Sequence, residues 1–179
     1  MVHWKNFALG LLSLAASSLK AAPMADVSAR TTAICFIVVH GPPITAITPG
    51  TAVTGLELAR SSTGAVTLAD SGFETLISYN NGGLGEFAFC AYYWLNIGTS
   101  THSYKPLSWG YGDQETFNWS AGAGQIVTAL GTSTYSTTSA FLACNESDSW
   151  VLYLQTGNDV PSGVTCVETQ LEVGTTTTI

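Results

Sequence analysis

Three acidic residues are the first candidates for chemistry, because glycoside hydrolysis needs two carboxylates about 5–9.5 Å apart. They are Glu86, Asp113 and Glu115. Asp113 and Glu115 stand two positions apart near the expected start of a strand, and that spacing directs both side chains to the same side. The competing interpretation is a solvated loop and strand edge, since acidic residues outnumber basic ones by twelve to five in this chain. A glycoside hydrolase is therefore an alternative rather than the main prediction.

Nucleophilic catalysis and metal binding have little support in the sequence. A serine or cysteine nucleophile needs a histidine beside it. Only His40 and His102 follow the expected leader, and no G-x-S-x-G motif is present. The cysteines form no C-x-x-C motif, and the two histidines stand at no zinc-ligand spacing. We therefore expect no metal, no cofactor and no enzymatic activity.

A dense group of aromatic residues is a stronger signal, and it points to sugar binding. Eight aromatic residues fall between positions 92 and 119. Segment 105–113 is predicted to be a glycine-punctuated loop that exposes Trp109 and Tyr111, with Asp113 nearby to bind sugar hydroxyls. The competing interpretation is that these rings fill the core, as they do in most β domains. Trp109, Tyr111 and Asp113 are the predicted carbohydrate-binding residues, with cell-wall polysaccharide as the expected partner.

The N-terminal segment predicts export. Lys5 precedes an apolar run, Phe7–Leu19, that is too short to span a bilayer, and small residues follow it. Residues 1–21 are expected to be a secretory signal peptide and 22–33 a spacer or pro-segment. A single β domain is expected over 34–174, with a flexible tail over 175–179 and no membrane span.

The charge balance narrows the partners of the exported domain. Without Lys5 and Lys20, three basic residues face twelve acidic ones, which gives a net charge of −9. Nucleic-acid binding requires clustered Lys and Arg, so we expect no nucleic-acid partner. Hydrophobic residues make up 46% of the chain, too many for a disordered protein.

Cysteines and glycosylation motifs agree with an extracellular location. The four cysteines, Cys35, Cys90, Cys144 and Cys166, predict disulfides in an exported chain. Three pairings are open. Cys35–Cys90 with Cys144–Cys166 is favoured, because the second bridge closes a short loop across two expected strands. The acceptor motifs at Asn118 and Asn145 predict surface glycosylation.

Apolar residues recur with a period of two along most of the chain, which predicts an all-β domain of about ten to twelve short strands. Such a number of strands favours a β-trefoil-like fold or a β-sandwich. A hairpin turn is expected at Asn80–Gly83, because Asn-Gly accommodates positive φ angles. The expected strands are 34–39, 52–59, 65–68, 73–79, 86–95, 115–119, 125–130, 140–144, 150–155 and 164–173.

The last third of the chain carries a recognisable pattern. Phe141-Leu142-Ala143-Cys144 is followed by Trp150-Val151-Leu152, by Asn158 through Gly163, and by Cys166. This pattern resembles the closing segment of small secreted fungal cell-wall proteins of the phialide-associated (PhiA-like) type. The resemblance covers about 35 residues, which are structural ones. It implies an extracellular or cell-wall location and a non-enzymatic role, and it carries over no catalytic residue.

The main expectation is a non-enzymatic, secreted or wall-associated fungal protein with a structural or surface role. A carbohydrate-binding, lectin-like module is the first alternative. A secreted effector and a glycoside hydrolase are the others, and the sequence leaves the oligomeric state open.

Overall fold

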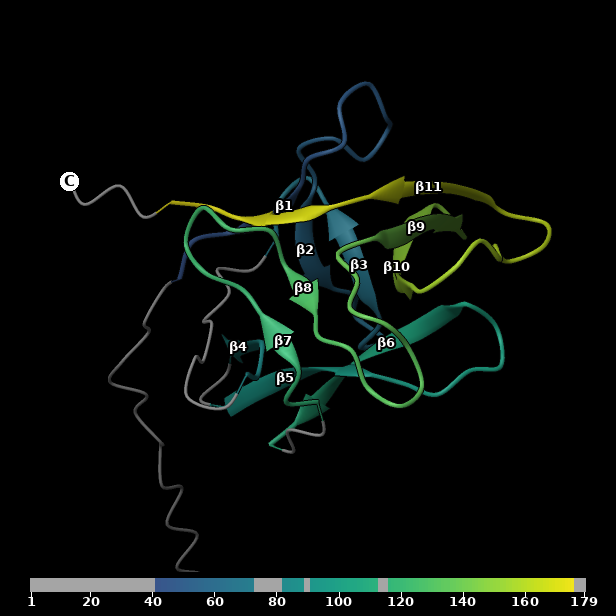
Figure 1. Ribbon diagram of the computed structural model, residues 1–179. Coiled ribbons are helices and arrows are strands. Elements are labelled where there is room, and N and C mark those ends of the chain that lie inside the picture. Colours follow the sequence, from purple (N-terminus) through teal and green to yellow (C-terminus); the bar gives the residue numbers. More distant parts are fainter. Residues whose placement is uncertain (1–40, 73–81, 89–90, 113–115, 176–179) are drawn as a thin grey trace, which may run out of the picture. The chain divides into compact units, whose positions relative to one another are not determined.

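The computed structural model describes residues 41–72, 82–88, 91–112 and 116–175, with only the backbone of residues 87 and 88. These residues contain twelve strands and no helix, so the prediction of an all-β domain is confirmed (Figure 1). In the described part, no helix is long and apolar enough to cross a membrane. The strands are β1 (Ile44–Ala46), β2 (Glu57–Arg60), β3 (Val66–Ala69), β4 (Gly85–Ala88), β5 (Ala91–Ile97), β6 (Tyr104–Tyr111), β7 (Trp119–Ser120), β8 (Thr128–Ala129), β9 (Phe141–Glu146), β10 (Ser149–Gln155), β11 (Thr165–Thr169) and β12 (Leu171–Val173).

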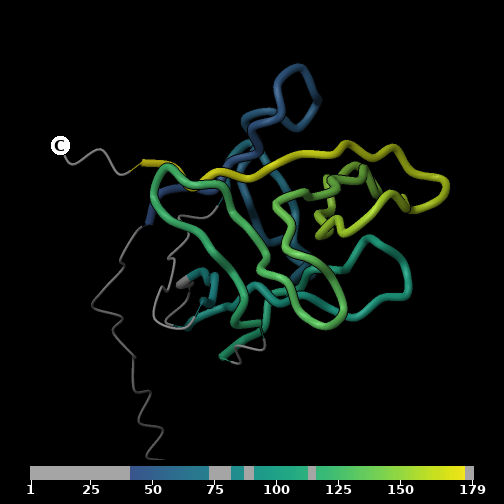
Figure 2. The backbone as a smooth tube through the Cα atoms, in the orientation of Figure 1, coloured from purple at the N-terminus to yellow at the C-terminus, as the bar shows by residue number. Residues whose placement is uncertain are grey.

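Ten strands form one curled antiparallel sheet, and β7 and β8 form a small second sheet. The main path runs β12-β1-β2-β3-β10-β6-β5-β4, with β9 paired to β10 and β11 paired to β9. Because β11 and β12 follow one another directly, the segment 165–173 joins β9 to β1 and closes this part of the sheet on itself. The yellow C-terminal segment can be followed along this course in Figure 2.

The closing segment changes partners at Gln170, which separates β11 from β12. Its carbonyl accepts a hydrogen bond from the amide of Ile47 at 3.0 Å, and its amide donates to the hydroxyl of Thr48. The strand predicted over 164–173 is therefore two short strands. Alternate residues are buried across the change of partner, because Thr169, Leu171 and Val173 are each at most 1% exposed.

The C-terminal hairpin follows the sequence pattern closely. β9 and β10 pair from Phe141 opposite Leu154 to Glu146 opposite Ser149. The two residues between them, Ser147 and Asp148, both have positive φ, as a tight two-residue hairpin turn requires. Cys144 lies directly opposite Cys166 on β11, and the two form the predicted disulfide.

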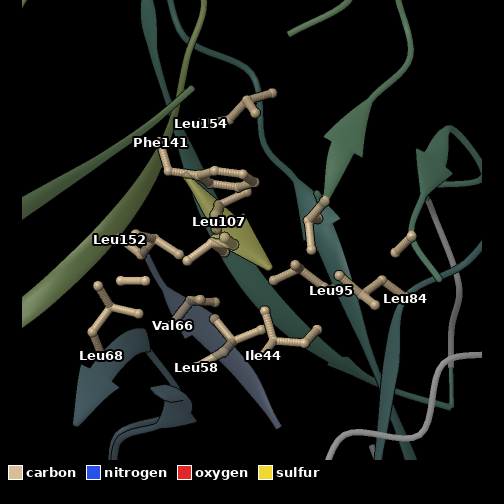
Figure 3. Packing of buried hydrophobic residues seen from close by; sticks show 14 of the residues in the cluster. Ile44, Leu58, Val66, Leu68, Leu84, Leu95, Leu107, Phe141, Leu152 and Leu154 are labelled. Atoms are coloured by element: carbon tan, nitrogen blue, oxygen red, sulfur yellow. The ribbon is translucent and has the colours of Figure 1, made fainter. Parts of the chain in front are cut away.

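One hydrophobic core lies inside the curled sheet (Figure 3). Ile44 and Leu58 meet Leu84 and Leu95 from the other arm of the sheet, and all four are at most 1% exposed. Trp119 packs on Phe141 with near-parallel rings 6.3 Å apart. The indole N–H of Trp119 donates to the carbonyl of Leu95 at 2.9 Å, so its one polar atom is satisfied in the core.

Three predicted elements between residues 52 and 112 are wrong in detail. Residues 52–55 form a turn, and the strand begins only at Glu57. The single strand expected over 86–95 is the hairpin β4–β5, in which Ala88 pairs with Ala91. The loop expected over 105–113 is mostly strand β6, which pairs with β10 at residues 104–106 and with β5 at residues 107–111. This backbone pairing outweighed the glycines that suggested a loop.

In place of the strands expected over 115–119 and 125–130, the described residues form the shorter strands β7 and β8, which pair with each other. Other expectations fall outside the described residues: strands 34–39 and 73–79, the Asn80–Asn81 part of the turn, and segments 1–21, 22–33 and 176–179.

Candidate functional site

The two described residues of the predicted carbohydrate-binding trio lie on a strand rather than on a loop. Trp109 and Tyr111 lie on β6, two positions apart and therefore on one face of the strand. Trp109 is half-buried against the core, and its indole N–H donates to the carbonyl of Ala59 at 3.4 Å. Tyr111 is 69% exposed, as predicted. Asp113 lies outside the described residues.

The candidate carboxylate that the structure describes is held in an ion pair. Glu86 on β4 is only 1% exposed, and its Oε2 lies 3.5 Å from Nε of Arg60. The guanidinium of Arg60 also lies over the ring of Tyr93, 3.9 Å from its centroid. Burial raises the pKa of Glu86, and the positive charge of Arg60 opposes that rise. Its expected partners, Asp113 and Glu115, lie outside the described residues, so no hydrolytic pair is assembled in the described part.

Two aromatic rings lie parallel on the other face of β5. Tyr92 and Trp94 are separated by 5.6 Å between ring centroids, with an angle of 11° between their planes. Trp94 lies opposite Gly85 of β4 on one side and Gly110 of β6 on the other. A Cβ atom on Gly85 would come within 2.7 Å of the indole, so the ring rests directly on this glycine. Glycines on both neighbouring strands thus leave room for the indole.

Tyr93 and Tyr111 add a second aromatic pair on the opposite face of the same strands. Their ring centroids lie 5.5 Å apart in an edge-to-face arrangement. The amide of Gly112 donates to the carbonyl of Tyr92 at 3.0 Å and holds the end of β6 against β5. We call Tyr92, Tyr93, Trp94 and Tyr111 the aromatic corner.

A separate pocket of about 400 Å³ lies among the loops that follow β5, precede β7 and follow β8. We call it the loop pocket. Its wall includes Phe117, Asn118 and Tyr135, together with the Thr132–Thr134 hydroxyl groups. Burial raises the pKa of Tyr135. Lys105 also lines the pocket, and its ammonium donates to the carbonyls of Ser100 and His102 at 2.7 and 2.8 Å.

The remaining predicted site residues lie apart from these features. His102 is exposed and stacks on Tyr104 with ring centroids 5.0 Å apart. Among the described residues, no group of three or more His, Cys, Asp or Glu side chains could hold a metal ion. Asn145 is exposed on β9, while Asn118 is half-buried. Cys35, Cys90 and His40 lie outside the described residues.

The parallel arrangement of Tyr92 and Trp94 was not predicted from the sequence. Both belong to the aromatic run, but they were not distinguished from rings that fill the core. The signal that could have found them is the run Tyr92-Tyr93-Trp94-Leu95, which places apolar side chains on both faces of one strand. Comparison with protein-family models, with curated proteins and with solved structures finds no match for this chain.

Proposed function

We propose that this chain is a secreted, non-enzymatic fungal protein that associates with the cell wall and binds neutral wall polysaccharide through its aromatic corner. The export signal expected at residues 1–21 and the resemblance of the last third to PhiA-like wall proteins support the location. The Cys144–Cys166 bridge also supports it, because disulfides persist mainly in oxidising compartments.

The observation that carries the proposed activity is the parallel Tyr92–Trp94 pair over Gly85. A sugar ring presents an apolar face of C–H groups, and a flat aromatic ring covers that face well. Tyr92 keeps 42% of its surface exposed in the folded chain. An aromatic surface held in this way by strands is already in place before a ligand arrives, so little ordering entropy opposes binding.

The charge of the chain favours a neutral ligand. Twelve acidic residues against five basic ones give a formal net charge of −7 for the full sequence. Anionic polymers would be repelled, whereas β-glucan and chitin carry no such penalty. Stacking of sugar rings on aromatic side chains needs no charged group on either partner.

The test is retention on insoluble β-glucan and on chitin. The Tyr92→Ala/Trp94→Ala double variant should lose at least about tenfold in affinity, a change equivalent to about 1.4 kcal/mol. Val160→Ala is the control, because Val160 is also a large apolar residue, 57% exposed, but lies outside the aromatic corner and does not line the loop pocket. Equal retention of the double variant and the wild type, or no retention on either polysaccharide, would contradict the proposed binding.

Location is tested separately by fractionating a fungal culture that expresses the full chain. The protein should appear in the medium or the wall fraction. Its confinement to the cell interior would contradict the proposed location without deciding whether the domain binds polysaccharide.

A further inference from the structure

The loop pocket contains one of the two glycosylation acceptors in its own wall. Asn118 begins the motif Asn118-Trp119-Ser120 and lines the pocket. The carbonyl of Asn118 accepts a hydrogen bond from the amide of Leu130 at 2.7 Å, and the next amide, of Trp119, donates to Gly82. Because the backbone is fixed on both sides, anything attached to Asn118 starts from a defined position beside the pocket.

The residues around Asn118 separate the acceptor from the core. Trp119 is 4% exposed and packs on Phe141, so the central residue of the motif points inward. Ser120, the hydroxyl residue of the motif, is exposed. Phe117 immediately precedes the acceptor and is 52% exposed, which is unusual for so large an apolar side chain. The motif thus has an exposed hydroxyl on one side of Asn118 and an exposed ring on the other.

The part of the pocket wall formed by residues 132–135 is rich in hydroxyl groups. The loop over 132–135 is held by a hydrogen bond from the amide of Thr132 to the carbonyl of Tyr135 at 2.9 Å. The hydroxyls of Thr132 and Thr134 lie 2.9 Å apart. An aromatic face with nearby hydroxyl groups fits a sugar ring, which has apolar C–H groups and hydroxyls of its own. A volume of about 400 Å³ is within the usual range for small-ligand sites.

We propose that an N-linked glycan on Asn118 occupies the loop pocket, with its first sugar packed against Phe117 and bonded to the hydroxyls of the 132–135 loop. When the glycan is attached, the amide nitrogen Nδ2 of Asn118 bonds to the anomeric carbon of N-acetylglucosamine. The bond from that carbon to the oxygen of a lipid pyrophosphate donor breaks. The pyrophosphate leaves with the bonding electrons, and one proton is lost from the amide nitrogen to a base of the transferase.

The second acceptor provides the contrast within the same chain. Asn145 is exposed on β9, near the tight turn at Ser147–Asp148. It is not among the residues that line the loop pocket. A glycan on Asn145 therefore extends into solvent, whereas one on Asn118 is partly covered by protein.

The inference rests on the export part of the proposed function, since this modification occurs in the secretory pathway. The experiment removes that dependence by placing a yeast secretion leader ahead of the full chain. Glycan occupancy at each acceptor is measured by mass spectrometry of peptides. Asn145→Gln removes the second acceptor and leaves Asn118. Ser120→Ala destroys the motif of Asn118 and leaves Asn145, so the two sites can be followed one at a time.

The decisive measurement is the rate at which an endoglycosidase removes each glycan from the folded protein. We expect removal from Asn118 to be at least tenfold slower than from Asn145, and the two rates to become equal after denaturation. Phe117→Ala should bring the Asn118 rate close to the Asn145 rate. An unoccupied Asn118, equal rates on the folded protein, or a Phe117→Ala variant with no faster removal would each overturn the proposal. None of these outcomes depends on binding to wall polysaccharide.

Discussion

The C-terminal hairpin and the aromatic corner are built from the same kind of antiparallel strands, but they use their side chains differently. In β9, Phe141 through Cys144 are all buried, because neighbouring strands lie on both sides and other parts of the chain cover both faces. In β5, Leu95 is fully buried while Tyr92 is 42% exposed. The hairpin buries its apolar side chains in the core, whereas the aromatic corner leaves part of its own apolar side chains exposed to solvent.

The two regions also differ in the kind of side-chain link that joins their strands to others. The Cys144–Cys166 bridge, an uncharged covalent link, joins β9 of the hairpin to β11. The Arg60–Glu86 ion pair lies beside the aromatic corner, with Arg60 over the ring of Tyr93. A buried ion pair contributes little net stability, because removing both charges from water costs free energy. We therefore expect the hairpin region to dominate folding stability and the corner to tolerate changes.

The largest expected effect comes from removing a core ring of the hairpin. Phe141→Ala should lower the free energy of unfolding by about 3–5 kcal/mol, because it deletes a fully buried ring and leaves a cavity beside Trp119. Tyr111→Ala in the aromatic corner should cost about 0.5 kcal/mol, since its ring is mostly exposed. Urea unfolding of the two variants measures both values. Similar losses in the two variants would show that the regions do not differ as described.

The next effect is the loss of the disulfide. Replacing Cys144 and Cys166 together with Ala should lower the free energy of unfolding by about 3 kcal/mol, the loop-closure estimate for a sequence separation of 22. The cysteines lie directly opposite one another on paired strands, so the β9–β11 pairing should survive in the folded state. Circular dichroism of the double variant checks this. Loss of the strand signal under native conditions would show that the bridge, not strand pairing, holds β11 in place.

The hairpin could be predicted from the sequence because each local signal agreed with the tertiary structure. Continuous apolar runs form the core of both strands, polar residues form the turn, and two cysteines stand at positions that become opposite one another. The predicted strands 140–144 and 150–155 differ from β9 and β10 by only one or two residues at their ends. The sequence did not predict that the closing segment changes strand partners at Gln170. That change depends on hydrogen bonds to Ile47 and Thr48, which lie far away in the chain.

The aromatic corner was harder to predict because its local signals conflict. Gly110 suggested a loop, yet it lies in β6 opposite Trp94, where its missing side chain leaves space for the indole. Tyr92 through Leu95 are apolar on both faces of the strand, so the alternation that identifies a buried face is absent. The two described sugar-binding residues expected from the sequence and the Tyr92–Trp94 pair proposed from the structure therefore lie in the same part of the chain, on the neighbouring strands β6 and β5.

The smallest expected effect tests whether burial or the ion pair with Arg60 dominates the pKa of Glu86. Burial raises the folded-state pKa of Glu86 above its ordinary value of 4.5, although Arg60 lowers it. Between those two pKa values the folded protein binds more protons than the unfolded chain. The contribution of Glu86 to stability is therefore greatest below pH 4.5 and is lost as the pH rises through the folded-state pKa. A single group can change the free energy of unfolding by at most about 1.4 kcal/mol per pH unit.

The measurement is the difference in unfolding free energy between the wild type and Glu86→Gln, obtained by urea unfolding from pH 4 to 7. Subtraction removes the contribution of the other titrating groups, and the stability of the wild type relative to the variant should fall as the pH rises. Arg60→Gln should extend this fall to higher pH, because the positive charge no longer opposes the effect of burial on the pKa of Glu86. A difference that instead grows with pH would mean that the ion pair stabilises the charged carboxylate more than burial destabilises it. The Arg60–Glu86 ion pair beside the aromatic corner would then add to folding stability, as the Cys144–Cys166 bridge is expected to do in the hairpin region.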